Sequence, residues 1–111
     1  MIYSQTEIYE YLIQNPLDVE VHIGDLEDMN GRDYIFLDYL NDDLIGFDDR
    51  GVYKTSIQVT VATRDFDNRK ILIDYIKDYF NVSISYEKSD EFEYYLARCS
   101  TEVLLYGKEN D

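Results

Sequence analysis

The sequence predicts an α+β fold, in which a mixed or antiparallel β-sheet carries two α-helices packed mainly on one face. Residues 53–63 alternate between apolar and polar side chains, as a half-buried strand does. Residues 5–15 and 67–80 carry apolar stripes at helical spacing. Each one-faced helix needs a sheet to cover its stripe, so helices and strands are expected to share one core. At 111 residues, the chain is expected to form a single domain, 1–111.

The first helix is predicted at residues 5–15. Ser4 and Glu7 have the spacing of a capping box, in which two side chains satisfy backbone amides at the start of a helix. Pro16 is expected to end the helix, because the residue before a proline avoids the helical conformation.

Two strands are predicted between this helix and the long strand. Residues 19–23 alternate in polarity, whereas residues 34–40 are almost continuously apolar, so both faces of the second strand are expected to be covered. The segments that follow these two strands, 24–33 and 41–51, are acidic. Residues 24–33 contain an Asn-Gly turn signal, and residues 41–51 are expected to form a loop or a hairpin arm.

After the long strand, the second helix is predicted at residues 67–80. Asp65 is its expected N-cap, and Asn81 is expected to close it in the left-handed conformation. The polar face of this helix, which includes Arg69, is expected to be solvated. Two further strands are predicted at 82–86 and 92–105. The predicted core consists of Ile8, Leu12, Ile57, Val59, Val61, Leu72, Ile76, Tyr79, Ile84 and Leu96.

The chain is strongly and unevenly acidic. Its net charge is −14, and residues 1–49 hold 13 acidic residues against one basic residue. Such a charge repels nucleic-acid phosphates and anionic membrane surfaces. It is compatible with a solubilising surface, with a cationic partner, or with the wall of a passage to which DNA must not adhere. The 12 tyrosines suit half-buried surfaces and interfaces, and they also suit strand faces.

No catalytic, cofactor-binding or metal-binding residue is predicted. His22 and Cys99 are the only histidine and cysteine, too few for a zinc site, and neither acidic segment has the spacing of a calcium loop. His22 is expected to face solvent from a strand, and Cys99 is expected to be a buried thiol. The sequence shows neither a signal peptide nor an apolar run long enough to span a membrane, so synthesis in a cytoplasm is expected.

The two acidic segments hold large apolar side chains among their charges. Segments of this length are often functional, and contact with a neighbouring subunit would explain why such side chains are kept there. The alternative is that these side chains pack beneath their own loops. The candidate subunit-interface residues are Leu26, Met29, Leu44, Ile45 and Phe47.

The order of elements resembles a known family. A capped helix, a short strand and an acidic region precede the long strand 53–64, which contains Gln58. An Asp-rich turn at 65–68, a helix at 69–80 and two closing strands ending at 102–106 follow. This arrangement is similar to the tail terminator and head–tail joining proteins of long-tailed bacteriophages, and the resemblance covers almost the whole chain.

The resemblance implies a structural virion protein without enzymatic activity. Members of that family form a ring, often of six subunits, that caps the tail tube and joins it to the head connector, and DNA passes through the ring without specific binding. The implied location is the tail or neck of the virion, after assembly in the host cytoplasm. Two alternatives remain open: another phage or prophage connector of similar fold, and an acidic inhibitor that mimics DNA.

Overall fold

A computed structural model describes residues 2–24, 31–43, 52–89 and 94–106. Its two helices are α1 (Gln5–Ile13) and α2 (Phe66–Lys77). Its six strands are β1 (Ile2–Tyr3), β2 (Glu20–Ile23), β3 (Tyr34–Asp43), β4 (Val52–Thr63), β5 (Ser83–Ser89) and β6 (Tyr94–Tyr106).

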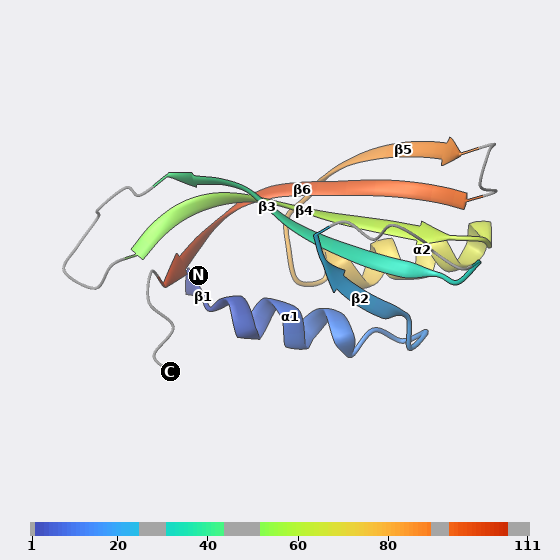
Figure 1. The fold of residues 1–111 in the computed structure, drawn as a ribbon, viewed down its shortest axis with the longest axis horizontal. Coiled ribbons are helices and arrows are strands. Elements are labelled where there is room, and N and C mark those ends of the chain that lie inside the picture. Colours follow the sequence, from blue (N-terminus) through green and yellow to red (C-terminus); the bar gives the residue numbers. More distant parts are fainter. Residues whose placement is uncertain (1, 25–30, 44–51, 90–93, 107–111) are drawn as a thin grey trace.

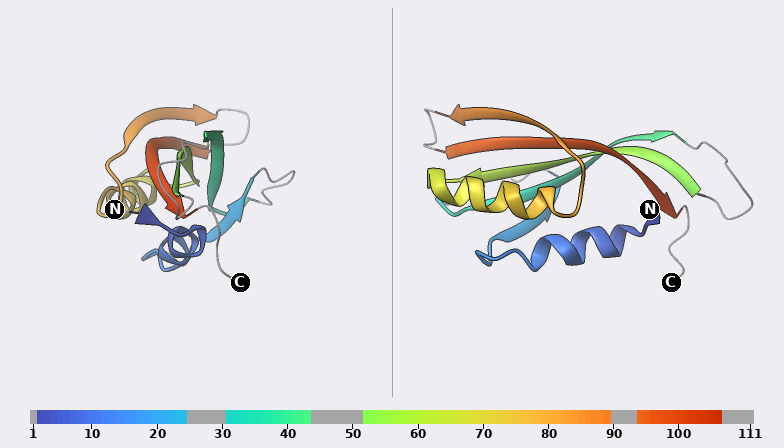
Figure 2. Two further views of the ribbon diagram at one scale, coloured as in Figure 1. Left: turned by 90° about the vertical axis from the view of Figure 1, so that its left-hand side faces the viewer. Right: turned by 180° about the vertical axis from the view of Figure 1, so that it is seen from behind.

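The strands form one twisted mixed sheet, with both helices beneath it in the view of Figure 1. The strand order is β1-β6-β4-β3-β2. Strand β5 also pairs with β6, along its first half, whereas β1 pairs with the last residues of β6. The pairs β3–β4, β4–β6 and β5–β6 are antiparallel, whereas β1–β6 and β2–β3 are parallel. The predicted α+β class and mixed sheet are confirmed. The end-on view in Figure 2 shows β5 and β2 as the two outer strands of the curled sheet.

Helix α1 begins as predicted and ends earlier than predicted. The Ser4 hydroxyl accepts a hydrogen bond from the backbone amide of Glu7 at 3.0 Å. The helix stops at Ile13 because the buried side chain of Asn15 organises the following turn. Its amide group donates to two backbone carbonyls, those of Leu12 and Val19, each at 2.9 Å. Asn15 therefore fixes the direction in which the chain enters β2.

Helix α2 begins at the predicted cap. A carboxylate oxygen of Asp65 accepts from the amides of Asp67 and Asn68 at 2.8 and 3.1 Å. The helix ends at Lys77, three residues before the predicted end. The prediction that Asn81 is left-handed is wrong, since Asp18 is the one non-glycine residue with a positive φ in the described part of the chain. The amides of the two residues after the C-cap instead both bond to the Ile76 carbonyl, which tightens the last turn.

The core lies between the sheet and the helices, and most of its predicted members are confirmed. The buried members of the prediction are Ile8, Leu12, Ile57, Val59, Val61, Leu72 and Ile76. Tyr79 and Ile84 pack against this core while partly exposed. Leu96 is a wrong prediction: it pairs with Ala62 and is half-buried on the sheet face turned away from the helices. Its neighbour Ala97, on the opposite face, is fully buried in its place.

The first residues of β3 are covered on both faces, as their continuous apolar run predicts. Tyr34 and Ile35 point to opposite faces and are both buried. The two-sided burial does not extend to the end of the predicted run, where the Leu40 side chain is 51% exposed.

Tyrosines join the two helices to each other. The rings of Tyr11 and Tyr75 stack with centroids 4.3 Å apart, and each hydroxyl donates to the backbone carbonyl of the other residue at 2.6 Å. Tyr79 stacks on Tyr11 at 4.0 Å and meets Tyr3 of β1 edge to face. Several of the chain's tyrosines therefore form the contact between the helices, a role different from the strand faces and interfaces expected from the sequence.

Replacement of Ile76 by alanine should lower the free energy of unfolding by about 2–5 kcal/mol, because it leaves a cavity beneath the sheet. Ile76 is fully buried, whereas Ile71, on the same helix, is 42% exposed. Ile71→Ala is therefore the matched control and should cost about 0.5 kcal/mol or less. Urea unfolding followed by circular dichroism measures both, and equal losses would contradict the observed burial.

Replacement of Tyr11 by phenylalanine should lower the free energy of unfolding by about 1 kcal/mol, because the Tyr75 carbonyl loses its donor. Tyr9→Phe on the same helix is the control, since no hydroxyl hydrogen bond joins Tyr9 to a described residue. A loss no larger than that of the control would show that the reciprocal bonds add nothing.

Stability should fall in alkali through Tyr11. Burial, with contributions from Tyr75 and Asp78, raises the pKa of Tyr11 from its ordinary value of 10.0 to about 12. The folded state therefore keeps a proton that the unfolded state releases, so this stabilisation is present below pH 10 and is lost as the pH rises from 10 to 12. The difference in unfolding free energy between wild type and Tyr11→Phe should narrow across that interval. A constant difference would contradict the raised pKa.

Candidate functional site

A groove lies between α2 and β5 on the described surface. Its volume is about 400 Å³. The lining residues combine aromatic or aliphatic side chains with cations: Phe66, Arg69, Lys70, Ile73, Asp74, Lys77 and Tyr86. Phe66 and Tyr86 are 56% and 60% exposed, so the groove presents two aromatic rings to the outside.

Arg69 is fixed in the groove by aromatic rings. Its guanidinium carbon lies 4.9 Å from the ring centroids of Phe66 and Tyr86 and 5.6 Å from that of Tyr95. One guanidinium nitrogen donates to the Leu96 carbonyl at 3.3 Å. A guanidinium has five N–H donors, so a side chain held in this way still has donors to offer. The prediction that Arg69 belongs to a solvated face is wrong, because Tyr86 of β5 and Tyr95 of β6 join Phe66 of α2 in surrounding it.

The groove is positively charged within an acidic protein. Arg69, Lys70 and Lys77 are opposed by Asp74, which pairs with Lys70 at 3.7 Å. Lys88 of β5 lies nearby, 5.6 Å from the Tyr95 ring. The chemistry of this surface suits a carboxylate next to a large apolar side chain, because cations and aromatic rings are within reach of the same ligand.

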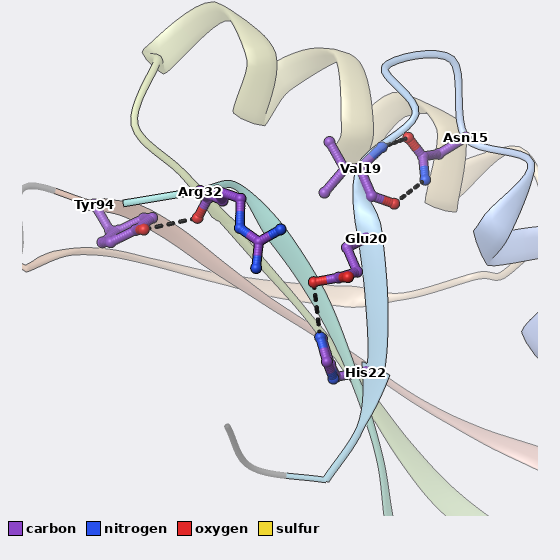
Figure 3. A network of polar contacts seen from close by, with 6 residues as sticks. All are labelled: Asn15, Val19, Glu20, His22, Arg32 and Tyr94. Atoms are coloured by element: carbon purple, nitrogen blue, oxygen red, sulfur yellow. Dashed lines mark hydrogen bonds and ion pairs between the residues drawn. The ribbon is translucent and has the colours of Figure 1, made fainter. Parts of the chain in front are cut away.

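The opposite edge of the sheet, at β2, has a different chemistry. The only histidine, His22, makes a hydrogen bond with Glu20 at 3.0 Å, and this bond holds the pKa of Glu20 below its ordinary value. Figure 3 shows Arg32 extending towards the same carboxylate. His22 also meets the Tyr34 ring edge to face at 5.2 Å. It is therefore half-buried, whereas the sequence predicted that it faces solvent. Ile23, at the end of the strand, is 63% exposed.

A second hollow, of about 360 Å³, lies beside β6 and the end of α2. Its lining is more polar and includes Lys54 and Glu102, which form an ion pair at 2.6 Å. Because these opposite charges satisfy each other, this hollow has less to offer a charged ligand than the groove at α2 and β5.

The described residues contain no group of three or more histidine, cysteine or acidic side chains placed to hold a metal ion. Cys99 is fully buried, as predicted, and burial raises the pKa of its thiol to about 11. A neutral, inaccessible thiol is a poor nucleophile. Among the described helices, neither is long and apolar enough to cross a membrane.

The predicted interface residues cannot be placed against these surfaces. Leu26, Met29, Leu44, Ile45 and Phe47 all lie outside the described residues. The groove was missed in the sequence because Tyr86 of β5, which lines it, and Tyr95 of β6, which contacts Arg69, lie far from α2 along the chain. The signal available was a cation, Arg69, three residues after an aromatic side chain, Phe66, on one predicted helix.

Cys99 should resist a thiol-specific reagent in the folded protein and react fully in denaturant, because it is buried and protonated at neutral pH. A cysteine introduced at exposed Ser85 in a Cys99→Ser background should react at once. Rapid labelling of native Cys99 would contradict the packing of β6 against the helices.

No protein-family model and no curated protein matches this sequence.

Proposed function

We propose that this chain is a non-enzymatic structural subunit that joins copies of itself into a ring. In this proposal, the ring acts as a tail terminator or head–tail joining component of a long-tailed bacteriophage. It would contain six subunits, as the family resemblance implies, and would contact the tail tube and the head connector.

The observation that supports association is the contrast between the two sheet edges. The α2–β5 edge is aromatic and positively charged, whereas the β2 edge carries Glu20 and is followed by an acidic segment. Both edges expose a large apolar side chain, Tyr86 on one and Ile23 on the other. A closed ring of identical subunits uses two different, complementary surfaces on each subunit. The two edges have the required difference in charge and lie at the two ends of the sheet.

The acidity of the chain supports a passage for DNA. A net charge of −14 per subunit gives a ring a strongly negative field, and a negative wall does not retain phosphates. A basic wall would bind DNA through many simultaneous phosphate contacts and would slow its passage.

Sedimentation at ~0.15 M salt, where charges are screened beyond about 8 Å, should show a ring-sized species at high protein concentration. Purified tails that lack their terminator should also recruit the protein. Ile23→Asp on the β2 edge should reduce both effects, whereas Ile71→Asp on α2, an exposed isoleucine at the other side of the sheet that does not line the groove, should not.

A wild-type protein that stays monomeric and is not recruited by tails would overturn this function. A monomer or dimer that instead inhibits a DNA-binding enzyme through competition with DNA would support the DNA-mimic alternative.

A further inference from the structure

We infer that the groove between α2 and β5 is the receptor for the acidic segment 24–33 of a neighbouring copy of this chain. This inference rests on the proposed function for its biological setting. Its physical basis is the charge, shape and position of the described groove.

The groove offers cations and aromatic rings in alternation. Lys70 and Lys77 lie seven residues apart on α2, about 10 Å along the helix axis, with Arg69 held against Phe66 and Tyr86. A ligand that matches this surface carries several carboxylates with an apolar side chain between them. A lone carboxylate would leave the rings exposed, and a purely apolar ligand would gain nothing from the positive charge of the groove.

Segment 24–33 has this composition. It holds four acidic residues and one basic residue, a net charge of −3, and Leu26 and Met29 stand among the acids. The thioether of a methionine packs well on aromatic rings. A long apolar side chain between carboxylates is the chemistry that the groove accepts.

The segment's flanks are held away from the groove of the same copy. The segment follows β2, and the groove lies at β5, with β3, β4 and β6 between them. At the other end of the segment, a carboxylate oxygen of Asp33 accepts from the Arg64 amide at 2.9 Å. The carbonyl of Arg32 accepts from the Tyr94 hydroxyl at 2.7 Å, on the sheet face turned away from the helices. The groove is lined chiefly by α2, on the opposite face, so the occupant is assigned to the segment of another copy.

The positions of the two surfaces fit side-by-side association. β2 pairs with the first residues of β3, and these pair with the last residues of β4, which lead into α2. The groove and the flanks of the acidic segment therefore lie at the same level along the strands, and the flank that follows β2 is on the opposite edge. A lateral neighbour would bring its segment to the groove without a large shift along the strand direction.

A peptide of residues 24–33 with blocked termini tests this directly. It should bind the full chain at protein concentrations where sedimentation shows a monomer. Lys77→Glu should weaken binding about tenfold, because an attraction becomes a repulsion. Lys54→Glu is the matched control, the same charge change outside the groove, and should leave binding unchanged. A peptide with Asn, Gln and Asn in place of Asp25, Glu27 and Asp28 should bind at least tenfold more weakly.

The same variants tested in assembly separate this inference from the proposed function. Ring formation should be reduced by Lys77→Glu and not by Lys54→Glu, with circular dichroism confirming that both remain folded. If rings form and neither assembly nor peptide binding distinguishes the two variants, the inference is overturned and the proposed function stands. If the wild type forms no ring and is not recruited by tails, the proposed function fails, and peptide binding alone decides what the groove accepts.

Discussion

The antiparallel pairing of β4 with β6 over twelve residue pairs is the constraint on which the rest of the structure depends. These two long strands supply the middle of the sheet, and their alternate residues supply the apolar face that covers both helices. Because the side-chain period is two, a slip of one residue would turn Val59 and Val61 towards solvent and leave the stripes of α1 and α2 uncovered. The β5 strand, the β3 strand and the helices all take their positions from this pair.

Aromatic residues on the two flanks of α2 have two different roles. On the side where α1 meets α2, Tyr11 and Tyr75 satisfy each other's backbone carbonyls. On the outer side of α2, aromatic rings hold Arg69 while leaving donors available. One helix therefore uses aromatic residues for stability on one flank and for presentation of a cation on the other. Presentation of Arg69 costs little stability, because the free energy of unfolding usually changes little with the choice of a surface residue.

The sequence allowed the local structure and much of the core to be predicted, because these depend on short-range patterns. The caps at Ser4 and Asp65 and the alternation in β4 required only neighbouring residues. The position of Leu96 could not be predicted, because the parity of β6 is set by its register with Ala62, a partner 34 residues earlier. The groove could not be predicted for the same reason: Arg69 becomes a fixed cation only when Tyr86 and Tyr95 arrive from two other strands.

The open edges of this sheet pose a physical problem that an assembly interface would solve. An unpaired strand presents free backbone groups and invites indiscriminate pairing with other chains. Here β2 has only four residues, and β5 carries Glu87 and Lys88, so neither edge is a flat apolar template. These features weaken uniform edge-to-edge pairing without removing the exposed side chains of Ile23 and Tyr86. An interface that relies on a cationic groove and an acidic segment restricts association to one orientation, because the same-edge pairings bring like charges together. Specific association is then favoured by the same charges that oppose aggregation.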